Sequence, residues 1–209
     1  DEVMLRQNKL PGDRNSNWQL GTGWAYASVT PWRLYKISQH GGGITTGAVA
    51  YWPKGLKKGK RNINSTPLHV IDILPTLTDI AGVDPQKREI KGESFYPVLK
   101  GKSFQRKDPL FFQFVDNRAI RTSEWTLAEV DNAGWELIRI KEDPLENKDL
   151  SSRYPEVVDS LSNIWLNWWK EQSGQSEYIP KSTSDSPHYA PQGDRGSGEF
   201  YVPAGRKKK

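Results

Sequence analysis

The chain has 209 residues, no cysteine, a mean hydropathy of −0.76 and a formal net charge of +5. This length allows one large domain or a medium domain with a smaller one, and the lack of cysteine excludes disulfides, thiolate metal sites and a cysteine nucleophile. No apolar run approaches the roughly 18 residues of a membrane span, and four of the five net charges lie in the terminal RKKK, so we expect neither a membrane nor a nucleic-acid partner.

The first predicted regular element is a strand at residues 44–52 (ITTGAVAYW). This segment is β-prone and mostly uncharged, which is typical of a strand buried on both faces of an α/β sheet, and Pro53 ends it. Residues 1–30 before it are polar and rich in Gly and Asn, so they are predicted to form loops. Trp24 in this region would pack over a neighbouring element or line a cleft.

A helical pattern follows at residues 66–82. Thr66 and Pro67 form a plausible helix start, and apolar residues recur at helical spacing up to residue 81. Pro75 interrupts the pattern, so the sequence predicts a short helix, a kink and a second helix that restarts at Pro75 and ends at Gly82. The strand–loop–helix order indicates the edge of a layered α/β domain.

The pattern changes at residue 108. Four short β-prone runs at 109–115, 118–122, 125–130 and 135–140 are separated by turn residues and predict an antiparallel meander. An apolar stripe at 153–172 then predicts one long helix, in which Trp165, Trp168 and Trp169 are expected to pack against the sheet. Together they form a small α+β unit. Residues 173–209 are rich in Ser, Pro and Gly and are predicted to be a tail.

The chain lacks a complete catalytic apparatus of any common type. It contains no phosphate-binding glycine loop and no Gly-x-Ser-x-Gly motif, and its three histidines, His40, His69 and His188, have no paired metal-ligand spacing. We therefore expect no metal site within this chain. His69 and Asp72 are expected to form a structural pair on the helix.

Short motifs in a fixed order carry more information than any one of them alone. In chain order they are GWA at 23–25 with Ser28, TPWRLYK at 30–36, GGITT at 42–46, WP at 52–53, HVIDILPTL at 69–77 with AG at 81–82, GES at 92–94, PVL at 97–99 with Gly101, NRAIR at 117–121 with Trp125, WEL at 135–137 and DPLENKDL at 143–150. From about residue 21 to about residue 172, the chain resembles the C-terminal portion of an arylsulfatase-type sulfatase of the alkaline-phosphatase-like superfamily.

The resemblance implies a fold and a division of the chain. Residues 1–107 would form the C-terminal part of the sulfatase catalytic α/β domain, residues 108–172 the α+β subdomain, and residues 173–209 the tail. The family converts a Cys or Ser to formylglycine and uses a divalent cation, usually calcium, to hold the sulfate. The nucleophile motif and the metal carboxylates belong to the N-terminal half of that family, so calcium is expected for the complete enzyme with no ligands here. The segment 131–134 (DNAG) mimics a metal pair and is predicted to be a turn.

One active-site residue of the family maps onto this chain, Lys36, whose counterpart contacts the sulfate. A lysine suits that task because its ammonium is a compact charge with three donors. His40 would either line the cleft or serve as a structural loop histidine. Trp24 and Trp32 would line a sugar or aglycone subsite or pack over the sheet edge. Gly41 departs from the family, which usually has an acidic residue there, and this puts the anchoring of the Lys36 loop in question.

The resemblance therefore predicts a sulfuric ester hydrolase that is inactive without its N-terminal half. Its expected substrate is a sulfate-ester small molecule or glycan, and periplasmic or secreted location is favoured. Two alternatives remain open: a non-catalytic binding or scaffold module that retains part of the fold, and a phosphoester hydrolase of the same superfamily.

Overall fold

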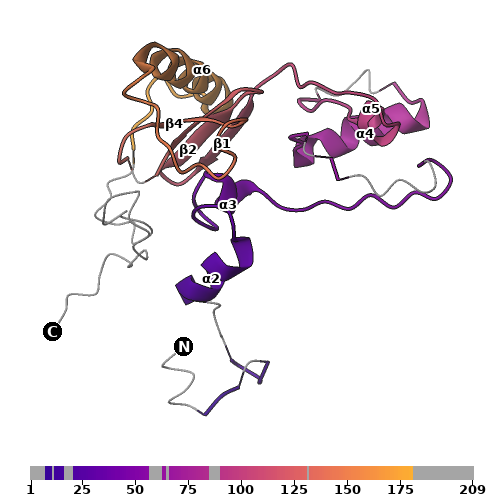
Figure 1. The fold of residues 1–209 in the computed structure, drawn as a ribbon, viewed down its shortest axis with the longest axis horizontal. Coiled ribbons are helices and arrows are strands. Elements are labelled where there is room, and N and C mark those ends of the chain that lie inside the picture. The colour runs from indigo at the N-terminus through magenta and orange to yellow at the C-terminus, as the bar shows by residue number, and fades with distance from the viewer. Residues whose placement is uncertain are drawn as a thin grey trace.

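The computed structural model describes residues 8–10, 12–16, 21–56, 63–64, 66–84, 90–130 and 132–180. Figure 1 shows a β-sheet with helix α6 (Pro155–Ser173) over it, and a separate group formed by α4 (Ile73–Ala81) and α5 (Tyr96–Leu99). Long extended segments join the two groups. Helix α3 (Gly41–Ile44) lies just below the sheet in this view, and α2 (Gly21–Val29) lies further from it, beyond α3.

The sheet is the antiparallel meander that the sequence predicts. Its strands are β1 (Leu110–Phe114), β2 (Asn117–Arg121), β3 (Trp125–Glu129) and β4 (Glu136–Arg139), and they pair in sequence order. Because side chains alternate between the two faces of a strand, the register aligns Ile120, Leu127 and Leu137 in one cross-strand row. All three are fully buried and form the core on which α6 packs.

Helix α6 covers this face with the predicted apolar stripe. Leu161 and Trp165 are buried in the core, and the Trp165 indole Nε1 donates to the carbonyl oxygen of Phe112 at 3.1 Å. Trp168 stacks on Phe111 with ring centroids 4.8 Å apart. Each aromatic ring of this kind removes about 150–250 Å² from water. The predicted packing role of the tryptophans is confirmed, and Gly174, at φ 69°, ends the helix.

Tyr178 and Arg118 pack against the tryptophans of α6. The Tyr178 ring lies 5.3 Å from Trp165 and 5.1 Å from Trp169, edge-on to both. The Arg118 guanidinium lies 4.6 Å from the Tyr178 ring centroid and 4.5 Å from that of Trp135. A cation over aromatic faces adds to the apolar packing, so residues as far as 178 contribute to this core.

The opposite face of the sheet carries both apolar and polar side chains. Leu110 and Ile138 are buried on it, and Ala119 and Ala128 share a buried cross-strand row with Glu136. The chain segment 33–42 reaches this face, where it contacts Asn117 and Glu136.

The α4 region begins differently from the prediction. A 3-10 turn, η1 (Val70–Asp72), leads directly into α4, and His69 caps it instead of Thr66. Pro75 is the third residue of α4, where its missing N–H would have had no intrahelical partner, so the helix does not restart there. Gly82 ends α4 at φ 65°, as predicted.

Two further predictions are wrong in this structure. Residues 21–29 form helix α2, although Gly21 and Gly23 lie within it, since the part from Trp24 to Val29 contains neither Gly nor Pro. Residues 45–52 form no strand: Val49 is 98% exposed and Tyr51 88%. No described strand lies beside them to accept their backbone hydrogen bonds, and a single strand cannot satisfy itself.

Among the described helices, none combines the length and apolar character needed to cross a bilayer.

Candidate functional site

Residues 33–42 form a tight loop with Lys36 exposed upon it. Leu34 and Ile37, on either side of Lys36, have φ angles of 62° and 91°. These left-handed values are costly for side chains with a Cβ, above all for β-branched Ile37, and persist only where surrounding contacts hold them. A Cβ on Gly42 would lie 1.9 Å from the Leu34 carbonyl oxygen, so glycine is required where the loop closes.

Arg33 ties this loop to the sheet. Its guanidinium donates to the Glu136 carboxylate at 2.6 Å and to the Glu146 carbonyl oxygen at 2.8 Å. The His40 ring is fully buried between these groups, with Nε2 3.2 Å from Arg33 and 3.5 Å from Glu136. Its Nδ1 faces the Ser38 hydroxyl at 3.1 Å. The cluster therefore joins both ends of the loop to strand β4.

The electrostatics of the cluster depend on Glu136. Burial by itself raises the pKa of this carboxyl, but hydrogen bonding and charge from His40 and Arg33 outweigh burial and bring the pKa from 4.5 down to about 2. The charged carboxylate is thus the form that the loop stabilises.

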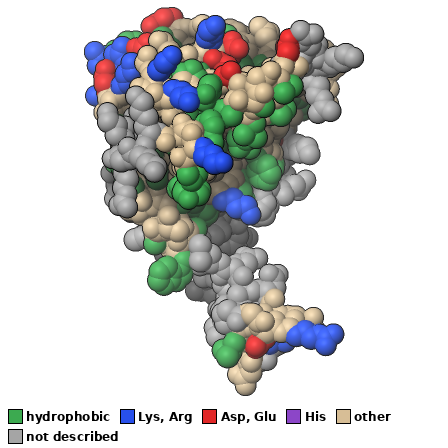
Figure 2. Space-filling view, turned by 90° about the vertical axis from the view of Figure 1, so that its right-hand side faces the viewer, with side chains coloured by type: hydrophobic (Ala, Val, Ile, Leu, Met, Phe, Trp, Pro, Cys, Tyr) green, Lys and Arg blue, Asp and Glu red, His purple; other side chains and the backbone are tan. Residues whose placement is uncertain are grey.

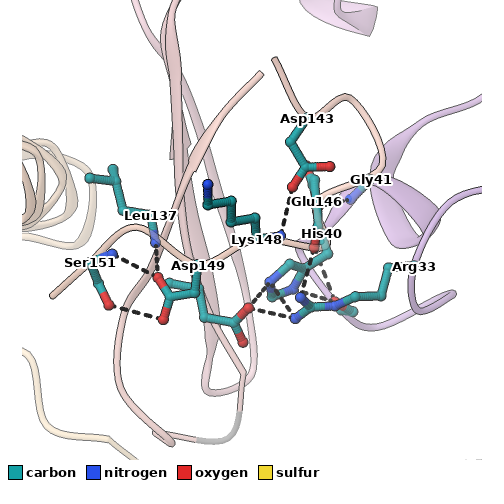
Figure 3. A network of polar contacts seen from close by, with 11 residues as sticks. Arg33, His40, Gly41, Leu137, Asp143, Glu146, Lys148, Asp149 and Ser151 are labelled. Carbon is teal, nitrogen blue, oxygen red and sulfur yellow. Dashed lines mark hydrogen bonds and ion pairs between the residues drawn. The ribbon is translucent and has the colours of Figure 1, made fainter. Parts of the chain in front are cut away.

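Glu146 reaches the same loop from a different segment. Its carboxylate accepts from the Gly41 N–H at 2.7 Å, and the Glu146 side chain is buried. The segment 143–151 holds Glu146 in place: Asp143 accepts from the Lys148 N–H at 2.7 Å, and Asp149 accepts from the Leu137 N–H at 3.0 Å (Figure 3). Strand β2 also contacts the loop, because the side-chain amide of Asn117 donates to the Ile37 carbonyl oxygen at 3.3 Å.

The structure brings some of the predicted site residues together. Lys36 and His40 lie on the same loop, but Lys36 is exposed and His40 is buried in the Arg33–Glu136 cluster. Trp32 is half-buried and lies beside Gly41, so close that a Cβ placed on Gly41 would lie 3.1 Å from the Trp32 Cδ1 atom. Trp24, on α2, is 72% exposed. The sequence analysis singled out neither Glu136 nor Glu146, although both lie in motifs that carry the family resemblance.

Glu146 bears on the question that Gly41 raises about how the loop is anchored. The Gly41 N–H donates to the carboxylate of Glu146, which lies 105 residues further along the chain in the DPLENKDL motif. The loop is therefore anchored from the segment that follows β4.

The second predicted pair is structural. The Asp72 carboxylate, fully buried, accepts from the backbone N–H of His69 at 2.7 Å and of Glu93 at 3.0 Å, and pairs with Arg106. Burial lowers the pKa of the His69 imidazole. The prediction of a satisfied helix pair is confirmed. The DNAG segment is a turn in its described residues, with Asn132 at φ 56° and Gly134 at φ 100°.

A calcium ion does not fit the residues of this chain that the structure describes. Calcium takes about 6–8 oxygen ligands, and no three His, Asp or Glu side chains within the described ranges come together as ligands.

Comparisons with known proteins agree with this architecture. The crystal structure of Ps i-CgsB has a TM-score of 0.56 at 22% identity, over 75% of this chain and 35% of that one. An uncharacterized sulfatase of Schizosaccharomyces pombe is 28% identical over 74% of this chain and 30% of its own length, and arylsulfatase K of Danio rerio is 28% identical over 63% and 27%. The fold is that of the C-terminal portion of a sulfatase.

The particular family follows from residues 35–167, which match the model described as N-sulphoglucosamine sulphohydrolase, C-terminal. The chain belongs to this family. It spans about 30% of the length of the curated relatives that it matches.

Proposed function

We propose that this chain is the C-terminal part of a sulfuric ester hydrolase and that it supplies Lys36 to the sulfate pocket. The single observation that carries the proposal is the conformation of the loop 33–42, in which the exposed Lys36 lies between Leu34 and Ile37, two residues with left-handed backbone. Three hydrogen bonds hold this loop in place: Asn117 donates to Ile37, Arg33 donates to Glu136, and Gly41 donates to Glu146. Strain of this kind is concentrated at functional sites. A fixed ammonium stabilises charge on a sulfate oxygen without reorganising during the reaction.

The rest of the chemistry lies outside this chain in our proposal. Formylglycine would supply the nucleophile and calcium would neutralise the sulfate, both held by the N-terminal half of the complete enzyme. Residues 1–107 would complete the catalytic domain, residues 108–172 would form the subdomain that braces the Lys36 loop, and residues 173–209 would form the tail. His40 would act by holding the loop, and Trp24 and Trp32 would contact the substrate beyond the sulfate.

The N-terminal half would dock on apolar side chains that this chain leaves exposed. On α4, Leu74 is 49% and Leu77 57% exposed, and Val49 and Tyr51 are almost fully exposed. Figure 2 views the side of the molecule that carries α4 and α5, and hydrophobic side chains gather across its middle. An apolar area of this kind is typical of a surface covered by another part of a protein.

We propose a sulfated glycan or a smaller sulfate ester as the substrate. One relative of the same fold was crystallised, by its title, in complex with k-i-k-neocarrahexaose, at 21% identity and a TM-score of 0.56. Periplasmic or secreted location fits such a substrate.

The test is complementation. The 209-residue chain would be combined with a separately expressed N-terminal half of a sulfatase of this family that carries formylglycine, and hydrolysis of 4-nitrophenyl sulfate and 4-nitrophenyl phosphate would be compared. The proposal expects sulfate turnover by the pair, none by either part, and a loss of about 10²–10³ in kcat for Lys36→Ala. The exposed Lys102→Ala is the matched control.

The other outcomes separate the alternatives. Preference for the phosphate ester would identify a phosphoester hydrolase. Stable association and substrate binding without turnover would identify a scaffold module, and full activity of Lys36→Ala would contradict the role of Lys36.

A further inference from the structure

Two cations lie three positions apart on the loop 33–42, and their surroundings differ. Lys36 is exposed, whereas the side chain of Arg33 is only 19% exposed. Two roles are open to an arginine so close to a sulfate-contacting lysine: it binds the sulfate itself, or it holds the lysine in place. The contacts of Arg33 distinguish between these roles.

The guanidinium of Arg33 bonds to two separate segments of the subdomain. Its Nη2 donates to the Glu136 carboxylate on β4 at 2.6 Å, and its Nη1 donates to the Glu146 carbonyl oxygen at 2.8 Å. Glu136 is buried and carries its charge at neutral pH, since its pKa is about 2. The positive charge of Arg33 is therefore matched by a buried carboxylate, and both Nη atoms are engaged by the subdomain.

The backbone of Arg33 closes the loop. Its carbonyl oxygen accepts from the Gly42 N–H at 3.0 Å, so the two ends of the loop meet at Arg33. Glu146 contacts both ends as well, because its carbonyl oxygen binds Arg33 and its carboxylate binds the Gly41 N–H at 2.7 Å (Figure 3). A displacement of the Arg33 side chain would therefore shift the start of the loop.

The chain between this anchor and the lysine leaves little freedom. Leu34, next to Arg33, and Ile37, next to Lys36, have left-handed φ angles of 62° and 91°. Strained residues of this kind keep their conformation only while the surrounding contacts hold it. The place of Lys36 thus follows from the place of Arg33.

We propose that Arg33 is a positioning residue of the sulfatase reaction: through its bonds to Glu136 and Glu146 it sets the place of the Lys36 ammonium, and it does not itself bind the sulfate. This inference rests on the proposed function of Lys36. A guanidinium suits the task because its planar fork reaches two acceptors in fixed geometry, whereas the ammonium of a lysine is a point charge. The α+β subdomain thereby acts on turnover through one side chain.

The test is a double-mutant cycle between positions 33 and 36, in the 209-residue chain combined with the N-terminal half and assayed on 4-nitrophenyl sulfate. Arg33→Lys keeps the charge and loses the fork. It should lower kcat about tenfold to a hundredfold and change KM less than about threefold, because a displaced ammonium loses most in the transition state. In a chain that also carries Lys36→Ala, Arg33→Lys should have no further effect, because no ammonium is left to misplace.

Two other variants complete the cycle. Arg139→Lys is the matched control, since Arg139 lies on the same strand as Glu136 but pairs with Glu124 on the surface, and it should leave kcat and KM unchanged. Glu136→Gln removes the charged acceptor of Arg33, so it should lower kcat in the same way and lose its effect in the Lys36→Ala chain. Circular dichroism checks folding, and Glu136→Gln decides the matter if Arg33→Lys does not fold.

Three results would overturn the proposal. Unchanged kcat in Arg33→Lys, with an active parent pair, would mean that the fork does not set the place of Lys36. An equal loss from Arg33→Lys with and without Lys36 would mean that Arg33 acts on the reaction directly, as a sulfate ligand does. Absence of turnover by the parent pair would reject the proposed function of the chain and this inference with it.

Discussion

Ile37 occupies a backbone conformation that it would not adopt in a free peptide, and the residue before it is Lys36. The contacts that hold it come from far along the chain: Asn117 binds its carbonyl oxygen, and Glu146 binds the N–H of Gly41. The position of the lysine is thus decided by residues about 80 and 110 positions away from it.

The Glu146 contact can be tested by hydrogen exchange. In Glu146→Ala the Gly41 N–H loses its acceptor, so its exchange should accelerate at least about tenfold, and the free energy of unfolding should fall by about 1–3 kcal/mol. The matched control is Glu142→Ala, which removes an exposed glutamate that pairs with Arg139 on the surface. Unchanged exchange at Gly41 in Glu146→Ala would contradict the anchoring role.

The Arg33–Glu136–His40 cluster predicts a pH dependence. Because the folded-state pKa of Glu136 is depressed from 4.5 to about 2, its contribution is present above the unfolded pKa and is lost as the pH falls through that window. A shift of this size corresponds to roughly 3 kcal/mol at most. Acid titration of unfolding, followed by tryptophan fluorescence, should therefore show stability falling between about pH 4.5 and 2.

Substitution separates this effect from general acid unfolding. Glu136→Gln should lower stability at pH 7 and flatten the profile in that window, while Glu124→Gln, which removes an exposed partner of Arg139, should leave the profile unchanged. A profile for Glu136→Gln that parallels the parent protein would exclude Glu136 as its source.

Sequence reasoning found the loop and missed its supports for a physical reason. Lys36 and His40 lie within one short motif, where spacing along the chain is close to spacing in the structure. Glu136 and Glu146 are 103 and 113 residues from Arg33, and only the folded sheet brings them to it. Gly41 put the anchoring of the Lys36 loop in question, but it gave no indication of which residue supplies the anchor.

At the level of elements, the predictions from sequence were correct for those strands and helices whose hydrogen-bonding and packing partners lie close by in the same chain. The strands β1 to β4 are joined by short turns, and α6 follows β4 after the segment 140–154. The apolar faces that the sequence pattern predicts for these strands and for the helix therefore pack against each other within this chain. Residues 44–52 have an equally good strand pattern, but no described strand lies beside them. Local pattern specifies the side-chain faces of a strand and leaves its hydrogen-bonding neighbours unspecified.

Helix ends offer a test with an internal control. Gly82 caps α4 at φ 65°, so Gly82→Ala should cost about 1 kcal/mol, because alanine is strained in the left-handed region. Gly23 lies inside α2 with nothing within 4 Å of the position of a Cβ, so Gly23→Ala should stabilise by about 0.5–1 kcal/mol. Urea denaturation of both variants measures the pair, and equal effects of the same sign would contradict the assignment.

For the whole molecule, the exposed apolar face of α4 predicts different consequences for folding and for assembly. Leu77 is 57% exposed, so Leu77→Glu should change the stability of this chain by less than about 0.5 kcal/mol. The same change should abolish association with the N-terminal half, because it places a charge in an apolar interface. Analytical ultracentrifugation measures the association, with Lys102→Glu as the control for added negative charge. Normal association of Leu77→Glu would exclude this face as the docking surface.

The edge-on contacts of Tyr178 with Trp165 and Trp169 determine where this polypeptide can be shortened without loss of its core. Cleavage after residue 172 would separate that ring from both indoles and from Arg118, opening one end of the aromatic core to water. Cleavage after residue 180 would leave these contacts intact. Limited proteolysis should therefore yield a resistant product that keeps Tyr178, and a recombinant version designed for crystallisation should extend at least that far.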